Sequence, residues 1–194
     1  MIEKGADVNA RTSDTYKSPV LHWAAQNGHE QVVQLLIKNG AEVNACTPYE
    51  KHTALHYASQ RGHEQVVRRL LEKAANANTD DGYVLPMAAH IGHKQIVRLL
   101  IEKGADVRAC HPFEKSTALH YASRNGHEEV MRILLWKGAD VNFYHTSALQ
   151  IASENGHEQV VRLLLENRAG KMHVEAQEVR EFACSVDLRL MGGL

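Results

Sequence analysis

The apolar residues of this chain follow a helical pattern that returns at intervals along the sequence. In QVVQLLI, residues 31–37, apolar side chains stand at relative positions i, i+1, i+3, i+4 and i+5, counted from Val32. This spacing makes a broad apolar stripe on one side of an α-helix, whereas a half-buried strand would alternate. The segment returns as QVVRRLL, QIVRLLI, EVMRILL and QVVRLLL, each shortly after a Gly-His pair. The pattern therefore predicts five amphipathic helices of one kind.

A shorter apolar segment precedes each Gly-His pair and predicts a second kind of helix. The five segments are PVLHWAAQN, TALHYASQR, YVLPMAAHI, TALHYASRN and SALQIASEN. Thr53, Thr117 and Ser147 begin three of them and can cap a helix through the side-chain oxygen. Paired small residues such as Ala24-Ala25 permit a neighbouring helix to approach closely. Because GADVN or a relative follows the longer helix, and its Gly favours a left-handed stop, each unit reads as helix, turn, helix and extended loop.

The units recur at intervals of 34, 30, 34 and 30 residues, measured between successive Gly-His pairs. The T-P-L-H-like segment, the Gly-His turn and the GADVN ending resemble the ankyrin repeat family over roughly residues 1–169. The resemblance implies an all-α solenoid of stacked helix-turn-helix units with projecting finger loops. It also implies protein–protein recognition without catalysis, through the fingers and the concave helix face.

The predicted boundaries follow from this register. We expect the end of a truncated repeat at 1–9, repeats at 10–43, 44–77, 78–107, 108–141 and 142–169, and an unmatched tail at 170–194. Residues 2–8 match residues 101–107, so either a repeat is cut short there or the array lacks a conventional cap. The tail either forms a capping helix over about residues 174–190 or is disordered.

The fingers alternate in length. Long fingers are expected at 10–18, 44–53 and 108–117, and short ones at 78–84 and 142–147. A deeper period of 64 explains this, because residues 44–73 match residues 108–137 at 20 of 30 positions. A two-repeat unit therefore looks duplicated. The junction of its two halves is predicted to be weak, since Ala74 replaces a Gly, Tyr83 a capping Thr and Pro86 a histidine.

The composition indicates which class of partner and which cellular compartment to expect. Lys plus Arg number 22 against 23 for Asp plus Glu, so no net positive charge favours nucleic acid. The sequence has no apolar run of the length that a signal peptide or a membrane span requires. Three cysteines, an odd number, and no N-x-[ST] sequon fit a reducing compartment. We therefore expect a cytoplasmic or other intracellular monomer that binds another protein, and neither nucleic acid nor a membrane.

Site chemistry is predicted to be absent. The 13 histidines mostly occupy repeated positions, which indicates structure, and equivalent residues of adjacent units lie too far apart to share a zinc ion. Cys46 and Cys110 are equivalent residues two repeats apart, so we expect free thiols. Cys184 has no neighbouring base with a recognisable signature. We expect no metal, no cofactor and no catalytic residue.

Aromatic residues are the candidate partner-binding positions. Rings on predicted loops lack a core to enter, and exposed rings on a rigid scaffold are typical binding anchors. Packing of one finger on the next is the alternative. Trp136, on the outward side of a longer helix, is expected either to anchor a partner or to cover the tail. The candidates are Tyr16, Tyr49, Tyr83, Phe113, Phe143, Tyr144 and Trp136.

Five other apolar residues, each one place after the T-P-L-H histidine, are expected to pack half-buried. They are Trp23, Tyr57, Met87, Tyr121 and Ile151. The sequence as a whole predicts a binding module or scaffold. Its alternative is a regulatory segment of a larger enzyme, channel or sensor, and an enzyme in its own right would depend on a tail too short to fold a site alone.

Overall fold

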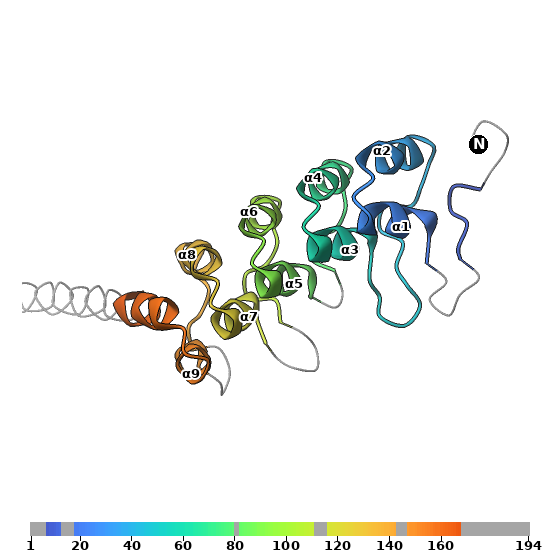
Figure 1. The fold of residues 1–194 in the computed structure, drawn as a ribbon. Helices are drawn as coiled ribbons and strands as arrows, with labels where there is room; N and C mark the ends of the chain where they lie inside the picture. The colour runs from blue at the N-terminus through green and yellow to red at the C-terminus, as the bar shows by residue number, and fades with distance from the viewer. Residues whose placement is uncertain (1–6, 13–17, 80–81, 111–115, 143–146, 168–194) are drawn as a thin grey trace, which may run out of the picture.

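The computed structural model describes residues 7–12, 18–79, 82–110, 116–142 and 147–167. These residues form short helices that pair and then stack into a solenoid (Figure 1). The pairs are α1 (Val20–Gln26) with α2 (Glu30–Lys38), α3 (Ala54–Arg61) with α4 (Glu64–Glu72), α5 (Val84–Ile91) with α6 (Lys94–Glu102) and α7 (Ala118–Asn125) with α8 (Glu128–Trp136). The helix α9 (Ala148–Glu154) is followed by helical residues 158–167. The predicted all-α repeat fold is confirmed.

The helices form two rows, which are called inner and outer below. The inner helices α1, α3, α5, α7 and α9 contact one another in order, and the outer helices α2, α4, α6 and α8 do the same. The loops between one pair and the next project beyond the inner row, as Figure 1 shows. The side of the molecule with the loops therefore also carries the inner helices.

The core runs along the whole array between the two rows. Paired small residues let inner helices approach closely, and Ala25, Ala58 and Ala88 are completely buried. The outer helices contribute Val and Leu side chains such as Val67 and Leu70, also completely buried. Each stripe is covered by neighbouring pairs, so the stability of one repeat depends on the next.

The Gly-His turns of neighbouring repeats contact each other, the glycine of one turn against the histidine ring of the next. Gly28 has a φ of +71°, and a Cβ added there would lie 2.6 Å from Nδ1 of His63. The Nε2 of that His63 ring lies 2.9 Å from the carbonyl oxygen of Gln26, to which it donates. The same arrangement joins Gly92 to His127 and Gly126 to His157. The recurrence of Gly-His is thus explained by contacts between repeats.

A second set of contacts joins the loops that follow the outer helices. The Asn44 side chain donates to the carbonyl of Ala74 at 3.1 Å and accepts from the backbone N–H of Asn76 at 2.8 Å. Asn78 makes the same pair of bonds to Gly104 and Asp106, at 2.7 Å each. Since Arg108 occupies the corresponding position one repeat later and has no acceptor, it cannot make this pair.

The predicted helix ends are also observed. Thr53 and Thr117 are N-caps, and His56 and His120 complete their capping boxes by accepting from the cap's own N–H at 3.0 and 3.1 Å. Ser147 accepts from the N–H of Leu149 at 3.2 Å.

The irregular junction also has the predicted backbone. Ala74 has a φ of +61°, so a residue with a Cβ takes the left-handed stop that glycines take in other units. Tyr83 is the N-cap of α5 without a side-chain cap hydrogen bond, and Pro86 lies in the first turn of that helix. The three replacements read from the sequence are therefore all present where the second and third repeats meet.

Candidate functional site

The long fingers are closed at their bases by isolated β-bridges. These bridges join Arg11 to Pro19, Cys46 to Thr53 and Cys110 to Thr117. In the second finger the N–H of Thr47 donates to the carbonyl of His52 at 2.9 Å, and the N–H of His52 donates to Oγ1 of Thr47 at 3.1 Å. Within the described residues, bridges of this kind occur only at the three predicted long fingers.

Tyr49 stands near the end of the second finger and is 77% exposed. Its ring therefore has the exposure that a binding anchor requires. The first and second fingers are joined, because the guanidinium of Arg11 donates to the carbonyl of Cys46 at 3.2 Å. The candidates Tyr16, Phe113, Phe143 and Tyr144 lie outside the described residues.

Tyr83 belongs to a row of rings that crosses the inner helices. Its ring centroid lies 6.3 Å from that of His52 and 6.0 Å from that of Tyr121. His52 also lies 5.9 Å from Tyr57, and Tyr121 lies 5.5 Å from His90. These five residues are called the inner aromatic row below. For Tyr83, the interpretation as a ring packed against its neighbours is the one that the geometry supports.

The inner aromatic row joins three successive repeats through contacts between side chains. Its spacings of 5.5–6.3 Å fall in the range of favourable edge-to-face and offset ring contacts. At its far end the guanidinium of Arg124 lies 5.9 Å from the centroid of Tyr121. The row thus joins these repeats through packed rings, of which Tyr121 is buried and the others are partly buried.

The residues after the T-P-L-H histidine do not all pack as expected. Tyr57 is partly buried and Trp23 is 46% exposed, so both are about half-buried as predicted. Met87, Tyr121 and Ile151 are buried more deeply than predicted, at 4–6% exposure. The exposed part of Trp23 makes it an additional candidate ring, on the inner helix α1 that follows the first finger.

His22 is the one residue in the described part of the chain whose pKa is strongly lowered. Its Nε2 donates to the carbonyl of Ala45 at 2.9 Å, while Nδ1 is buried without a hydrogen-bond partner. Burial lowers the pKa of His22 from 6.5 to about 4, with smaller contributions from Arg11 and from other histidines. The ring is therefore neutral at physiological pH.

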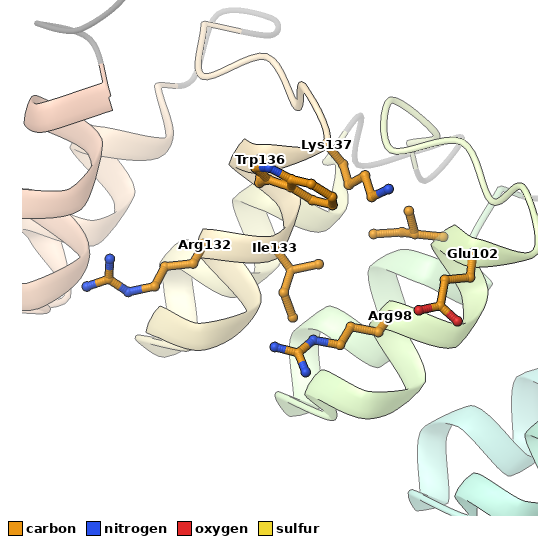
Figure 2. A pocket seen from close by; sticks show the side chains of 7 residues that line it. Arg98, Glu102, Arg132, Ile133, Trp136 and Lys137 are labelled. Carbon is orange, nitrogen blue, oxygen red and sulfur yellow. The ribbon is translucent and has the colours of Figure 1, made fainter.

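Trp136 lies on the opposite side of the molecule from the fingers, at the end of the outer helix α8. It is 79% exposed and borders a hollow of about 530 Å³ between α6 and α8. Figure 2 shows Arg98, Ile133 and Lys137 beside it. The Nζ of Lys137 lies 4.4 Å from the centroid of the indole ring, a cation–π contact.

Across the described ranges no cluster of three or more His, Cys, Asp or Glu side chains could hold a metal ion. In the same residues no helix has both the length and the apolar character needed to cross a membrane. Cys46 and Cys110 are free thiols in the bridge positions of two separate fingers.

Comparison with known families identifies the repeat. A family model that describes three copies of the ankyrin repeat matches residues 1–81 and again residues 85–176. This chain belongs to the ankyrin repeat family. The resemblance read from the Gly-His turns and the GADVN endings is therefore confirmed, and the ankyrin register covers most of the chain. Ankyrin repeats generally mediate interactions between proteins, which is the coarse function that family membership supports.

Among curated proteins, a short part of the ankyrin array resembles a much longer protein. The chain is 54% identical over 54 residues to protein fem-1 homolog C of Bos taurus, of Mus musculus and of Homo sapiens. Those residues make up 28% of this chain and 8% of each relative. Because the match covers less than a tenth of the relatives' length, it supports the repeat and not the activity of the whole relative.

Sequence reasoning missed several residues of this surface. His52 was assigned to a finger and His90 to no site, yet both belong to the inner aromatic row. The sequence does distinguish His90, because it is an aromatic residue at a position where the other ankyrin units have Gln26, Gln60, Arg124 and Glu154. A ring at a position that is polar in the other units indicates a side-chain contact that those units do not make. His52 carried no such signal, because its ring contacts depend on how adjacent repeats are stacked.

Proposed function

We propose that this ankyrin array is a binding module or scaffold that holds a partner protein against its long fingers and inner helices. The observation that carries the proposal is the exposure of two rings, Tyr49 on the second finger and Trp23 on the inner helix α1. Exposed rings held by a rigid framework lose little conformational entropy on binding, so they are effective anchors.

The framework beneath these rings supports the proposal. The inner aromatic row joins neighbouring repeats, and the bridge at the base of each long finger closes that finger. The hydrogen bond from Arg11 to the carbonyl of Cys46 fixes the first finger against the second. A partner laid along this side meets a preorganised surface, which reduces the free energy lost on ordering.

The experiment begins with affinity capture by the intact chain and identification of the bound protein. Tyr49→Ala and Trp23→Ala should each weaken the captured complex by about 30-fold, since truncation of an aromatic anchor removes about 2 kcal/mol. The substitution Phe113→Ala, at the corresponding place in the sequence of the third long finger, is expected to act in the same direction. Binding is measured by titration calorimetry.

One exposed glutamate of an outer helix serves as the control. Glu72→Ala lies away from the fingers and should change affinity by less than about threefold. Circular dichroism verifies that every variant melts as the parent does. If the finger variants bind normally and an outer-helix variant does not, the assignment of the binding side is wrong.

A regulatory role inside a longer protein is the second candidate. It is favoured by the match to fem-1 homolog C, because the 54 matched residues are only 8% of that longer chain. The full-length transcript decides between the two, because a catalytic or channel domain in the same reading frame favours the regulatory role. The proposal also includes a non-catalytic, cytoplasmic or otherwise intracellular protein.

A further inference from the structure

The outer helices α4 and α8 share a pattern of charge that α6 lacks. In α4 and α8 a Glu begins the helix and an Arg follows four residues later. Arg68 lies 3.1 Å from Glu64, and Nε of Arg132 donates to Glu128 at 3.1 Å. Such pairs partly neutralise each other on the helix surface. The helix α6 begins with Lys94 instead, so its Arg98 lacks the carboxylate that its counterparts have.

Arg98 therefore has no ion-pair partner of the kind that Arg68 and Arg132 have. It is exposed and has no ion pair with any residue that the structure describes. Lys94, one turn earlier, lies 4.0 Å from Glu129 on α8, so this carboxylate of α8 pairs with Lys94 and not with Arg98. A guanidinium that no neighbouring carboxylate engages is available to a carboxylate from outside the chain.

A second departure from the repeat occurs beside the same residue. Trp136 stands where the other ankyrin units have Lys38, Glu72, Glu102 and Glu166. Its indole, with Ile101 and Ile133, gives the hollow between α6 and α8 an apolar lining, and Arg98 and Lys137 stand at its sides (Figure 2). An exposed Trp over an apolar depression is the kind of feature found at the centre of interfaces.

The charges around the hollow determine the chemistry of its occupant. Three cationic residues, Arg98, Arg132 and Lys137, line it against the single anionic residue Glu102. Since Arg132 is engaged by Glu128, Arg98 and Lys137 provide the available positive charge. The apolar lining offers nothing to a phosphate backbone, whereas a peptide can satisfy the indole and the cations together.

We propose that the hollow between α6 and α8 is a second interaction surface, which binds an acidic segment of a partner protein. The segment places one apolar side chain against Trp136 and carboxylates against Arg98 and Lys137. This surface lies on the outer helices, away from the fingers, so it does not depend on the function proposed above. The two surfaces allow the array to hold two partners at the same time.

The test uses the full chain and a defined set of probes. Random 12-residue peptides displayed on phage are selected on the intact protein, and the enriched peptides are synthesised for titration. Trp23→Phe leaves Trp136 as the one remaining tryptophan of the two in the chain, so its emission reports on the hollow directly. Enriched peptides are expected to carry Asp or Glu next to Leu, Phe or Trp, and to shift this emission.

Substitutions then locate the peptide. Trp136→Ala should weaken the selected peptides by about 30-fold and Arg98→Glu by at least about tenfold, whereas Arg68→Glu, the equivalent residue of α4, should change affinity by less than about threefold. These side chains are exposed, so melting curves should match those of the parent. Raising the salt concentration should weaken the parent complex more than the Arg98→Glu complex.

Several results would overturn the proposal. One is selection of no peptides, or of peptides without acidic residues. Another is binding that survives Trp136→Ala. Competition by a 20-nucleotide single strand of thymidines would assign the surface to nucleic acid. Finally, if iodide fails to quench Trp136 in the full chain, the hollow is already covered by the chain itself or by a second copy. Each outcome leaves the Tyr49 and Trp23 tests unaffected.

Discussion

The buried histidines of the inner helices can form hydrogen bonds through both ring nitrogens. The residue that caps the helix determines whether Nδ1 has a partner. In His56 and His120, Nδ1 accepts from the backbone N–H of the capping Thr. In the first repeat the cap is Pro19, which has no N–H, so Nδ1 of His22 is left without a partner. An unsatisfied buried acceptor typically costs about 1–3 kcal/mol.

Replacing that proline should restore the missing hydrogen bond. We predict that Pro19→Thr raises the free energy of unfolding by about 1 kcal/mol, because it supplies both a donor to His22 and a capping hydroxyl. The gain is reduced by the greater freedom of the unfolded chain without Pro. Urea denaturation measures it. The control Pro48→Thr, on the exposed part of the second finger, should give no gain, and an equal gain there would refute the explanation.

The lowered pKa of His22 predicts how the free energy of unfolding depends on pH. Burial lowers the pKa of His22 to about 4 in the folded state against 6.5 in the unfolded chain. Between these values the unfolded chain binds more protons than the folded one. The contribution of neutral His22 to the free energy of unfolding is therefore fully present above pH 6.5 and is lost as the pH falls toward 4. The loss between pH 7 and pH 4.5 should be smaller by about 2 kcal/mol in His22→Gln than in the parent. Equal losses in both proteins would mean that His22 does not titrate in this way.

At the scale of the element, glycines of two kinds hold the array together. Gly28, Gly62, Gly92 and Gly126 have positive φ, and an added Cβ would also lie 2.6 Å from the histidine ring of the next repeat. Gly40, Gly104 and Gly138 have positive φ but open space around them. The first kind is required by packing between repeats, the second by the conformation of the helix stop alone.

These two kinds should respond differently to the same substitution. Gly104→Ala is expected to cost about 1 kcal/mol, the penalty for left-handed backbone. Gly92→Ala should cost roughly 3 kcal/mol, because the methyl group also displaces His127 and breaks its bond to the carbonyl of His90. Thermal denaturation of both variants provides the comparison. Equal losses would show that the ring moves aside without penalty.

Ala74 offers the reverse experiment at the irregular junction. Because the equivalent glycines have open space, the Ala74 methyl group is accommodated and the cost is conformational. Ala74→Gly should stabilise the protein by roughly 1 kcal/mol. In the parent, hydrogen exchange should be faster over residues 72–90 than over residues 136–154, and the variant should narrow this difference. Equal protection of both segments in the parent would show that the junction is not weak.

The helices and their ends were predictable because each is determined by neighbours in the sequence. The capping Thr residues, the Gly stops and the irregular residues Ala74 and Pro86 all act within one turn of chain. The inner aromatic row was not predictable, since its contacts join residues about 30 or 40 apart, as between His52 and Tyr83 or Tyr83 and Tyr121. Such contacts depend on the offset between stacked repeats, which no single unit encodes.

The first repeat shows how a local pattern fails to predict burial. Val32 is 44% exposed, although its counterparts Val66, Ile96 and Val130 are only 1–2% exposed. The side chains are of the same type and stand at the same helix position. The difference arises because a preceding outer helix covers the later ones, so burial of this stripe is a property of the array and not of the unit.

For the whole molecule, the two rows of helices separate the proposed binding surfaces. Tyr49 is exposed on the second finger and Trp23 on the inner helix α1, whereas Trp136 is exposed on the outer helix α8. A solenoid of short units holds these surfaces at fixed distances, because each repeat contacts its neighbours along the whole length. An adaptor between two proteins needs this kind of separation.

The central claim is that a partner protein lies against the fingers and inner helices, and site-specific photo-crosslinking tests it most directly. A photoreactive phenylalanine derivative replaces Tyr49, Trp23 or Glu72 in turn, and irradiation in cells is followed by mass spectrometry. Positions 49 and 23 should crosslink to the same protein, at peptides close together in that partner, while position 72 should not. Crosslinks to one shared protein from position 72 and none from positions 49 and 23 would contradict the account.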